Sequence, residues 1–231
     1  MMAKQRFYMS QRTIRRIAAV TIFAAALGIV ADICLLLYGY SNNPSVTFLA
    51  AIPAFILTTG YWLGICAIPI YMLGGAVAVA CGLRASPLAA PYVATAVATS
   101  FAATAAHAQT ASTVLACVAA GSTEIFSSCL LSGPGAPTIL VAMLLLGVTA
   151  MSGMFALAVH SHPTSFPRFM AALNPLVLML LLSAAALNFG PGSHPVLFAI
   201  PSIAAFIFAV LVHQALRCRP GKHDGRARGS P

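Results

Sequence analysis

The sequence contains very few charged residues. Only 6% of its 231 residues are Asp, Glu, Lys or Arg, whereas a soluble domain carries about 25%. Hydrophobic residues make up 60% of the chain. A water-facing surface cannot be built from this composition, so we expect most of the chain to lie in lipid. The sequence therefore predicts an integral membrane protein.

Familiar catalytic and metal-binding motifs are also absent. The chain has no Walker loop, dinucleotide fingerprint, HExxH or GxSxG. Its six cysteines include no CxxC pair, so neither a zinc site nor a redox motif is indicated. His160 and His162 have no acid or cysteine nearby, which favours an interfacial turn over a metal site. The sequence thus indicates no metal and no cofactor, and it leaves open whether the protein is an enzyme.

The positive charge lies mainly near the two ends of the chain. The net charge is +9, and of twelve Lys and Arg, five lie in residues 1–16 and five in residues 217–228. Only Arg84 and Arg168 lie between. Basic clusters of this kind flank membrane spans on the cytoplasmic side and attract anionic lipid head groups. We expect the lipid bilayer as the partner, with anionic head groups at the basic termini, and no nucleic acid.

Six apolar segments reach the length of about 20 residues that crosses a bilayer as a helix. These predicted spans are residues 16–40, 60–83, 88–109, 137–159, 168–188 and 194–216. We expect an all-α polytopic transmembrane bundle, with residues 1–216 forming one domain and residues 217–231 a disordered basic cytoplasmic tail. Asn174-Pro175 interrupts the fifth span and predicts a kink or a small polar pocket.

Two further stretches do not fit the pattern of spans. Residues 46–58 are apolar but too short to cross alone, and residues 110–132 are rich in Ser and Thr. Both are expected to form re-entrant or interfacial segments on the outer side, although residues 110–132 also fit a weak span. Cys117 and Cys129 lie in the second stretch, and the sequence leaves open whether they form a disulfide or remain two free thiols.

The basic residues predict the orientation of the bundle. With six spans and a cytoplasmic N-terminus, the turns at Arg84 and Arg168 and the C-terminal tail all face the cytoplasm. Arg168 follows Pro167 at a helix start, where its guanidinium can hold a lipid phosphate. We expect a multi-pass protein of the bacterial inner (plasma) membrane with both termini cytoplasmic.

One acid lies inside an otherwise apolar span. Asp32 is placed in the outer half of the first span. On insertion scales, a charged residue at the bilayer centre costs about 2.5–3.5 kcal/mol. It should therefore face the bundle interior or a wet cavity. Two interpretations stay open: a structural hydrogen bond to a Ser, Thr or Tyr on a neighbouring helix, and a functional site.

Other polar side chains are predicted near the same mouth of the bundle. The candidate ligand-binding residues are Asp32, Tyr38, Tyr61, Trp62, His107 and Glu124. A carboxylate, an imidazole and a second carboxylate can bind a cation, relay protons or perform acid–base chemistry. Each also has a simpler interpretation, such as an aromatic belt for Tyr61 and Trp62. The sequence does not establish whether these groups meet.

Two stretches together resemble a family of bacterial inner-membrane proteins. The first is Gly28-Ile-Val-Ala-Asp32 followed by Leu35-Leu-Leu-Tyr38, in which an Asp precedes Leu-Leu-Tyr in the first helix. The second is Thr164-Ser-Phe-Pro-Arg168-Phe with Ala172-Leu-Asn-Pro-Leu176, in which an aromatic-Pro-Arg-aromatic run opens a late helix. The resemblance implies a six- or seven-helix membrane protein, and it implies no activity.

Three hypotheses for function follow. The first is a binding or transport-type bundle that recognises a small cation or a polar lipid head group around Asp32. The second is a membrane-embedded enzyme that acts on a lipid or sterol-like substrate with Asp32, His107 and Glu124 as acid–base groups. The third is a structural membrane subunit. The sequence does not indicate the oligomeric state.

Overall fold

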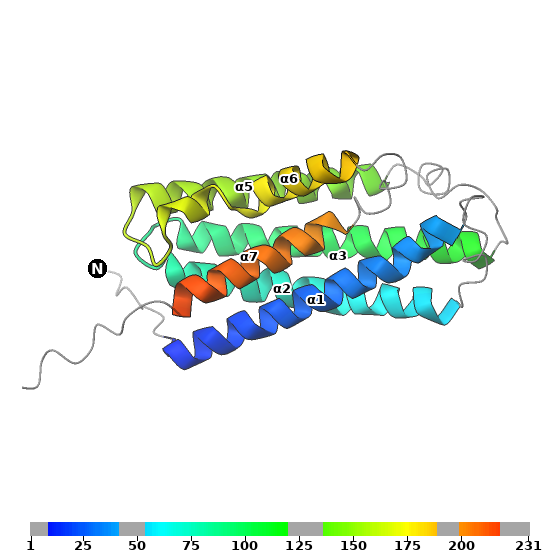
Figure 1. The fold of residues 1–231 in the computed structure, drawn as a ribbon, viewed down its shortest axis with the longest axis horizontal. Coiled ribbons are helices and arrows are strands. Elements are labelled where there is room, and N and C mark those ends of the chain that lie inside the picture. The colour runs from blue at the N-terminus through cyan, green and yellow to red at the C-terminus, as the bar shows by residue number, and fades with distance from the viewer. Residues whose placement is uncertain (1–8, 42–53, 120–135, 189–198, 218–231) are drawn as a thin grey trace, which may run out of the picture.

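The protein is an all-α bundle. The computed structural model describes residues 9–41, 54–119, 136–188 and 199–217, and every regular element in these ranges is helical. The helices lie side by side along the long axis of the molecule (Figure 1). In chain order they are α1 (Gln11–Ser41), α2 (Ala54–Gly82), α3 (Ala89–Ala119), α5 (Ala136–Ser161), the 3₁₀ turn η2 (Arg168–Ala171), α6 (Pro175–Leu187) and α7 (Ile200–Arg217).

Five of these helices are long and apolar enough to cross a membrane, namely α1, α2, α3, α5 and α7. Their outer surfaces carry large hydrophobic side chains, such as Phe23, Phe101 and Leu146, that are more than half exposed. A soluble protein rarely exposes apolar surface on this scale, whereas lipid tails are a favourable solvent for it. These features confirm the expected multi-pass membrane protein.

The fifth predicted span, residues 168–188, does not form a single membrane-length helix. The chain there forms η2 and then α6, a helix of 13 residues. At about 1.5 Å per residue, α6 alone is about 20 Å long, which is shorter than a hydrocarbon core of about 30 Å. It nevertheless runs from the end of the bundle where α5 finishes toward the end where α7 begins (Figure 1). The cause of the shortened helix is Pro175, which has no N–H and disfavours helical backbone at the residue before it. The interruption at Asn174-Pro175 is therefore the start of the helix.

The polar groups at this helix start are paired. The Asn174 side chain accepts a hydrogen bond from Val177 N (3.1 Å) and donates one to Ala171 O (2.8 Å). Ser152 Oγ on α5 accepts a hydrogen bond from Leu176 N (3.1 Å). Because Asn174 is buried, these bonds satisfy groups that would otherwise be unpaired in an apolar surrounding. The sequence predicted a kink or a small polar pocket at Asn174-Pro175, and the structure shows a helix start capped by the Asn174 side chain.

Two other boundaries differ from the prediction. Helix α2 begins at Ala54 and α3 continues to Ala119, so parts of the stretches expected to be re-entrant belong to long helices. In α3, the hydroxyls of Ser112 and Thr113 both donate to Gln109 O (2.9 Å each). Such bonds to the preceding turn accommodate Ser and Thr within a helix. Residues 46–53 and 120–132, with Cys129, lie outside the described residues, as does the tail 218–231.

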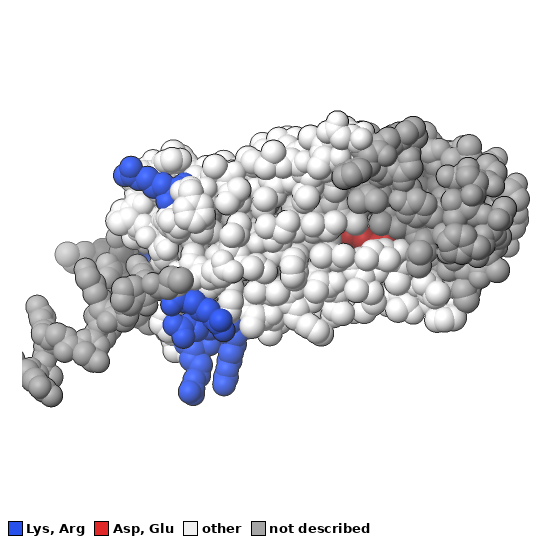
Figure 2. Space-filling model, viewed as in Figure 1, with Lys and Arg blue, Asp and Glu red and all other residues white. Residues whose placement is uncertain are grey.

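The arginines of the described ranges gather at one end of the bundle. On the face shown in Figure 2, the basic side chains lie at the end where α1 begins and α7 ends. Asp32, the one acid among the described residues, lies in the opposite half of the molecule (Figure 2). The structure therefore separates the basic end from the half of the bundle that contains the carboxylate. The orientation across the membrane stays a prediction.

Candidate functional site

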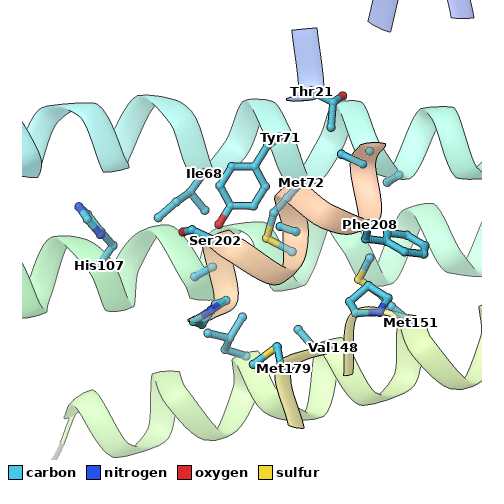
Figure 3. A pocket seen from close by; sticks show the side chains of 18 of the residues that line it. Thr21, Ile68, Tyr71, Met72, His107, Val148, Met151, Met179, Ser202 and Phe208 are labelled. Atoms are coloured by element: carbon cyan, nitrogen blue, oxygen red, sulfur yellow. The ribbon is translucent and has the colours of Figure 1, made fainter. Parts of the chain in front are cut away.

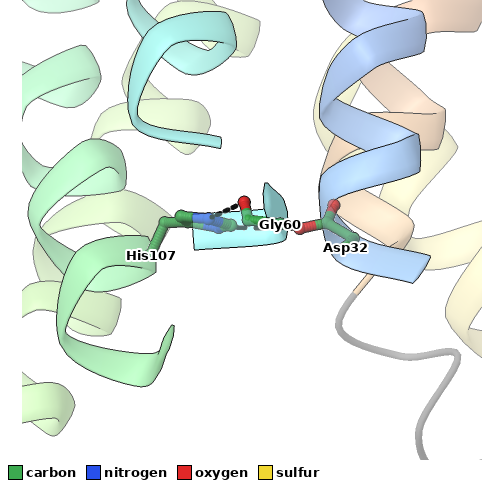
Figure 4. Close-up of polar contacts among 3 residues, drawn as sticks. All are labelled: Asp32, Gly60 and His107. Atoms are coloured by element: carbon green, nitrogen blue, oxygen red, sulfur yellow. Dashed lines mark hydrogen bonds and ion pairs between the residues drawn. The ribbon is translucent and has the colours of Figure 1, made fainter. Parts of the chain in front are cut away.

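The polar site consists first of Asp32 on α1 and His107 on α3. Their side chains approach each other across the bundle, with His107 Nδ1 3.7 Å from Asp32 Oδ1 (Figure 4). The imidazole is 7% exposed and the carboxylate 14% exposed. Two polar groups from segments far apart in the sequence thus meet inside an apolar helix bundle.

The main chain of α2 orients the imidazole. His107 Nε2 lies 3.2 Å from Gly60 O (Figure 4). A carbonyl oxygen can only accept a hydrogen bond, so Nε2 carries a proton and donates it. The nitrogen that faces Asp32 is therefore Nδ1. At 3.7 Å the two atoms are too far apart for a direct hydrogen bond, but one proton, on either the imidazole or the carboxylate, leaves the pair without net charge.

Two glycines four positions apart on α2 make this contact possible. A Cβ on Gly64 would collide with the His107 ring, and a Cβ on Gly60 would lie 2.8 Å from Cys34 Cβ and 2.9 Å from Ala31 O. Gly64 therefore leaves room for the imidazole, and Gly60 allows close approach of α1. The pattern Gly-x-x-x-Gly is a known signal of close helix packing in membranes. The sequence analysis did not use it.

A second pair of polar groups lies on the other side of Asp32. The side chain of Ser202 on α7 hydrogen-bonds with Asp32 and with Tyr71 on α2. Figure 3 shows the Tyr71 hydroxyl directed toward Ser202. Gly28 makes room for both, since a Cβ there would lie 3.1 Å from Tyr71 Cε1 and 3.4 Å from Ser202 Oγ. Gly28 and Asp32 are four positions apart and so share one face of α1.

These four side chains form the polar end of a cavity of about 350 Å³. The remainder of the cavity is almost entirely apolar and is lined by α1, α2, α3, α5, α6 and α7 (Figure 3). On α3 the lining residues run from Tyr92 to Thr110, which corresponds to about 27 Å of helix. The apolar lining includes Met72, Val79, Val148, Met151, Met179 and Phe208.

Two other predicted site residues, Tyr61 and Trp62, lie apart from the Asp32–His107 contact. Trp62 is 59% exposed and points outward, with its ring 5.1 Å from that of Tyr61 in an edge-on contact. Tyr61 packs against a small apolar cluster that includes Leu57. The side chain of Tyr38 and all of Glu124 lie outside the described residues. Of the predicted residues whose side chains the structure describes, Asp32 and His107 are the two that it brings together.

The two arginines predicted to mark the cytoplasmic side lie apart from the site. Arg84 and Arg168 are exposed at the turns after α2 and after α5. Within the part of the chain that the structure describes, no group of three or more His, Cys, Asp or Glu side chains is placed to hold a metal ion. The chemistry of the site is that of one carboxylate, one imidazole and two hydroxyls.

Tyr71 and Ser202 were missed by the sequence analysis. The chain contains six tyrosines, and nothing in the residues around Tyr71 distinguishes it from Tyr92, which is also fully buried. The usable signal was Gly28, which lies one turn before Asp32 and marks the same face of α1 as a close contact.

Comparison with protein families, with curated proteins and with solved structures found no match to this chain. The resemblance of the two sequence motifs to a bacterial membrane-protein family therefore stays a prediction.

Proposed function

We propose that this protein binds an amphipathic, lipid-like small molecule. Its apolar chain would occupy the cavity, and its polar head would contact Asp32, His107, Ser202 and Tyr71. The observation that carries this proposal is the distribution of polarity in the cavity, which has one polar end and an otherwise apolar wall. A cavity with this distribution is complementary to a molecule with one polar end and an apolar chain.

The size of the cavity supports a small-molecule ligand. Ligand pockets usually measure about 300–1,000 Å³ and are lined mainly by apolar side chains with a few polar groups. A volume of about 350 Å³, distributed along most of the length of the bundle, describes a narrow space. Such a space suits a single apolar chain better than a rigid ring system.

The wall beyond the polar end favours an apolar chain over water or ions. Thr21 and Tyr92 are the polar side chains that line that part of the cavity. The Thr21 hydroxyl donates to Ile17 O (2.9 Å), so its proton is already used. A transport path for a small cation needs polar groups along its length, and this wall offers few. Binding of an amphipathic molecule is the better fit.

A membrane-embedded enzyme on a lipid substrate is the second candidate. The Asp32–His107 contact favours it, because a carboxylate beside an oriented imidazole can move a proton to or from a bound head group. The two candidates differ in outcome. A binding protein returns its ligand unchanged, whereas an enzyme releases a product of different mass.

The arrangement of charge supports a location for the site. Since arginines resist translocation, we place the basic end of the bundle in the cytoplasm, with both termini there, and the polar end of the cavity in the outer half of the bacterial inner membrane. Reaction of single-cysteine variants with a membrane-impermeant thiol reagent tests this placement. A cysteine in the turn near Arg84 should react only in permeabilised cells.

The binding proposal can be tested with cavity-filling variants. Val148 lines the cavity and is 9% exposed, whereas Leu157 on the same helix is 56% exposed. Val148→Trp should fill the cavity and Leu157→Trp should not. We expect added dodecanol or dodecylamine to raise the unfolding temperature of the wild type and of Leu157→Trp in non-ionic detergent, but not that of Val148→Trp.

A second cavity variant, Met179→Trp, provides the same test if Val148→Trp fails to fold. Mass spectrometry of lipid-like molecules that remain bound after purification supplies an independent readout. Equal stabilisation of all variants by both probes, or no stabilisation of the wild type, contradicts the proposal.

A further inference from the structure

We propose that the head group bound at this site is a protonated amine, which replaces the proton that otherwise neutralises the Asp32–His107 pair. This inference rests on the proposed function and adds the class of ligand and the coupling of its binding to proton release. The geometry that supports it is the one-proton arrangement of the two side chains.

The first step is the position of the proton. His107 Nε2 donates to Gly60 O, which leaves Nδ1 facing Asp32 Oδ1 at 3.7 Å. In one arrangement the imidazolium faces a carboxylate, and in the other a carboxylic acid faces a neutral imidazole. In both the pair has no net charge. Removal of the proton leaves a net negative charge inside an apolar bundle, which is costly unless another cation replaces it.

The second step concerns what else can balance the carboxylate. The cavity lining includes no Lys or Arg, and the arginines of the described residues gather at the far end of the bundle (Figure 2). Among the described residues, the polar or titratable side chains that line this end of the cavity with Asp32 are Tyr71 on α2, His107 and Thr110 on α3, and Ser202 on α7. None is a permanent cation. The charge of Asp32 is therefore balanced by a proton on the Asp32–His107 pair or by a ligand.

The third step is the choice among head groups. An anionic head would meet the Asp32 carboxylate with no fixed cation beside it, so it is disfavoured. An alcohol can form hydrogen bonds with Asp32, Ser202 and Tyr71 and leaves the proton in place. An ammonium group can donate hydrogen bonds to the same three side chains, and its positive charge also balances the Asp32 carboxylate. Since charge-assisted hydrogen bonds are the stronger kind, the amine is the best match.

The exchange is balanced in atoms and charge. The ammonium group enters and donates hydrogen bonds to the Asp32 carboxylate, the proton on the pair leaves to water, and His107 remains neutral with Nε2 bound to Gly60 O. The net charge of the site is zero before and after. Binding that releases a proton is favoured by rising pH, and this gives the sign of the pH dependence.

The test uses three probes with the same apolar chain: dodecylamine, dodecanol and dodecanoate. Their affinities for the purified full-length protein are measured by titration calorimetry in non-ionic detergent between about pH 5.5 and 8. Dodecylamine stays protonated there, because an alkyl ammonium resembles lysine with a pKa of about 10.4. We expect its affinity to rise up to about tenfold per pH unit while the pair holds its proton, and the affinity of dodecanol to stay constant.

Variants locate the effect. Asp32→Asn should abolish the pH dependence of dodecylamine binding and equalise its affinity with that of dodecanol. Tyr71→Phe should weaken dodecylamine binding, whereas Tyr92→Phe, a matched change at the other end of the cavity, should not. Calorimetry in two buffers with different heats of ionisation counts the released proton directly.

The outcomes separate this inference from the function on which it rests. If no probe binds the wild type, the proposed function fails. If dodecanol or dodecanoate binds as tightly as dodecylamine, or if dodecylamine binds without proton release, the protein still binds amphipathic molecules and the amine inference is overturned.

Discussion

Replacing Gly64 with alanine should weaken the fold by forcing His107 out of its place. The added Cβ would collide with the imidazole, and the ring can leave only by giving up its hydrogen bond to Gly60 O and its contact with Asp32. A lost hydrogen bond costs about 0.5–1.5 kcal/mol, and overpacking costs about 1–3 kcal/mol. Alanine recovers about 0.5–1 kcal/mol through its better helix propensity. We expect a net destabilisation of about 0.5–4 kcal/mol, with a central value of about 2 kcal/mol.

The measurement is the free energy of unfolding in mixed micelles, where a denaturing detergent is titrated against a mild one. Gly153→Ala is the matched control, because a Cβ on Gly153 has no heavy atom within 4 Å. It should leave stability unchanged or slightly increase it. In a double-mutant cycle, Gly64→Ala should cost much less stability in the His107→Ala background than in the wild type, because the imidazole with which the new Cβ collides is then absent.

The reasoning is refuted if Gly64→Ala is as stable as Gly153→Ala. It is also refuted if the loss persists in full when His107 is already alanine, because the cause would then lie elsewhere in α2.

Three further predictions concern single side chains. Asp32→Asn should keep the stability, since an amide can still pair with His107 and Ser202, whereas Asp32→Ala should cost about 1–3 kcal/mol in the same assay because it leaves those groups unpaired. Ser152→Ala should cost about 1–3 kcal/mol because the half-buried Leu176 N–H loses its acceptor, and Ser112→Ala, at an exposed position, should cost much less. Trp62, the one tryptophan in the chain, should be quenched strongly by brominated phospholipid in proteoliposomes because it is 59% exposed. Absence of quenching would place it against protein.

Much of the fold followed from the sequence because lipid imposes a simple rule. A spanning helix must be about 20 residues long and apolar, and this rule located the five membrane-length helices. It placed the start of the fifth predicted span too early, because average hydropathy does not register where a proline forces a helix to begin. Asn174 and Pro175 are two residues in an apolar stretch, but Pro175 sets where the helix begins.

The site was accessible to sequence reasoning only where a residue is costly in lipid. Asp32 and His107 stand out because an ionisable group inside a bundle needs a partner. The glycines that bring them together do not stand out. Gly64 packs against His107, whereas a Cβ on Gly153 would have no heavy atom within 4 Å. The Gly-x-x-x-Gly spacing with Gly60 distinguishes Gly64 as a position of close helix packing, but it does not indicate which side chain fills the space. Ser202 and Tyr71 likewise become site residues only through the packing of α7 on α1 and α2.

The most direct test of the central claim is photo-crosslinking with an alkyl amine that carries a diazirine at the far end of its chain. The account predicts labelling of residues that line the cavity away from Asp32, such as Val79, Tyr92 and Val212, and loss of that labelling in Val148→Trp. Labelling confined to exposed side chains such as Phe23, Phe101 and Leu146, unchanged in Val148→Trp, would show that the chain stays in the bilayer and would contradict the account.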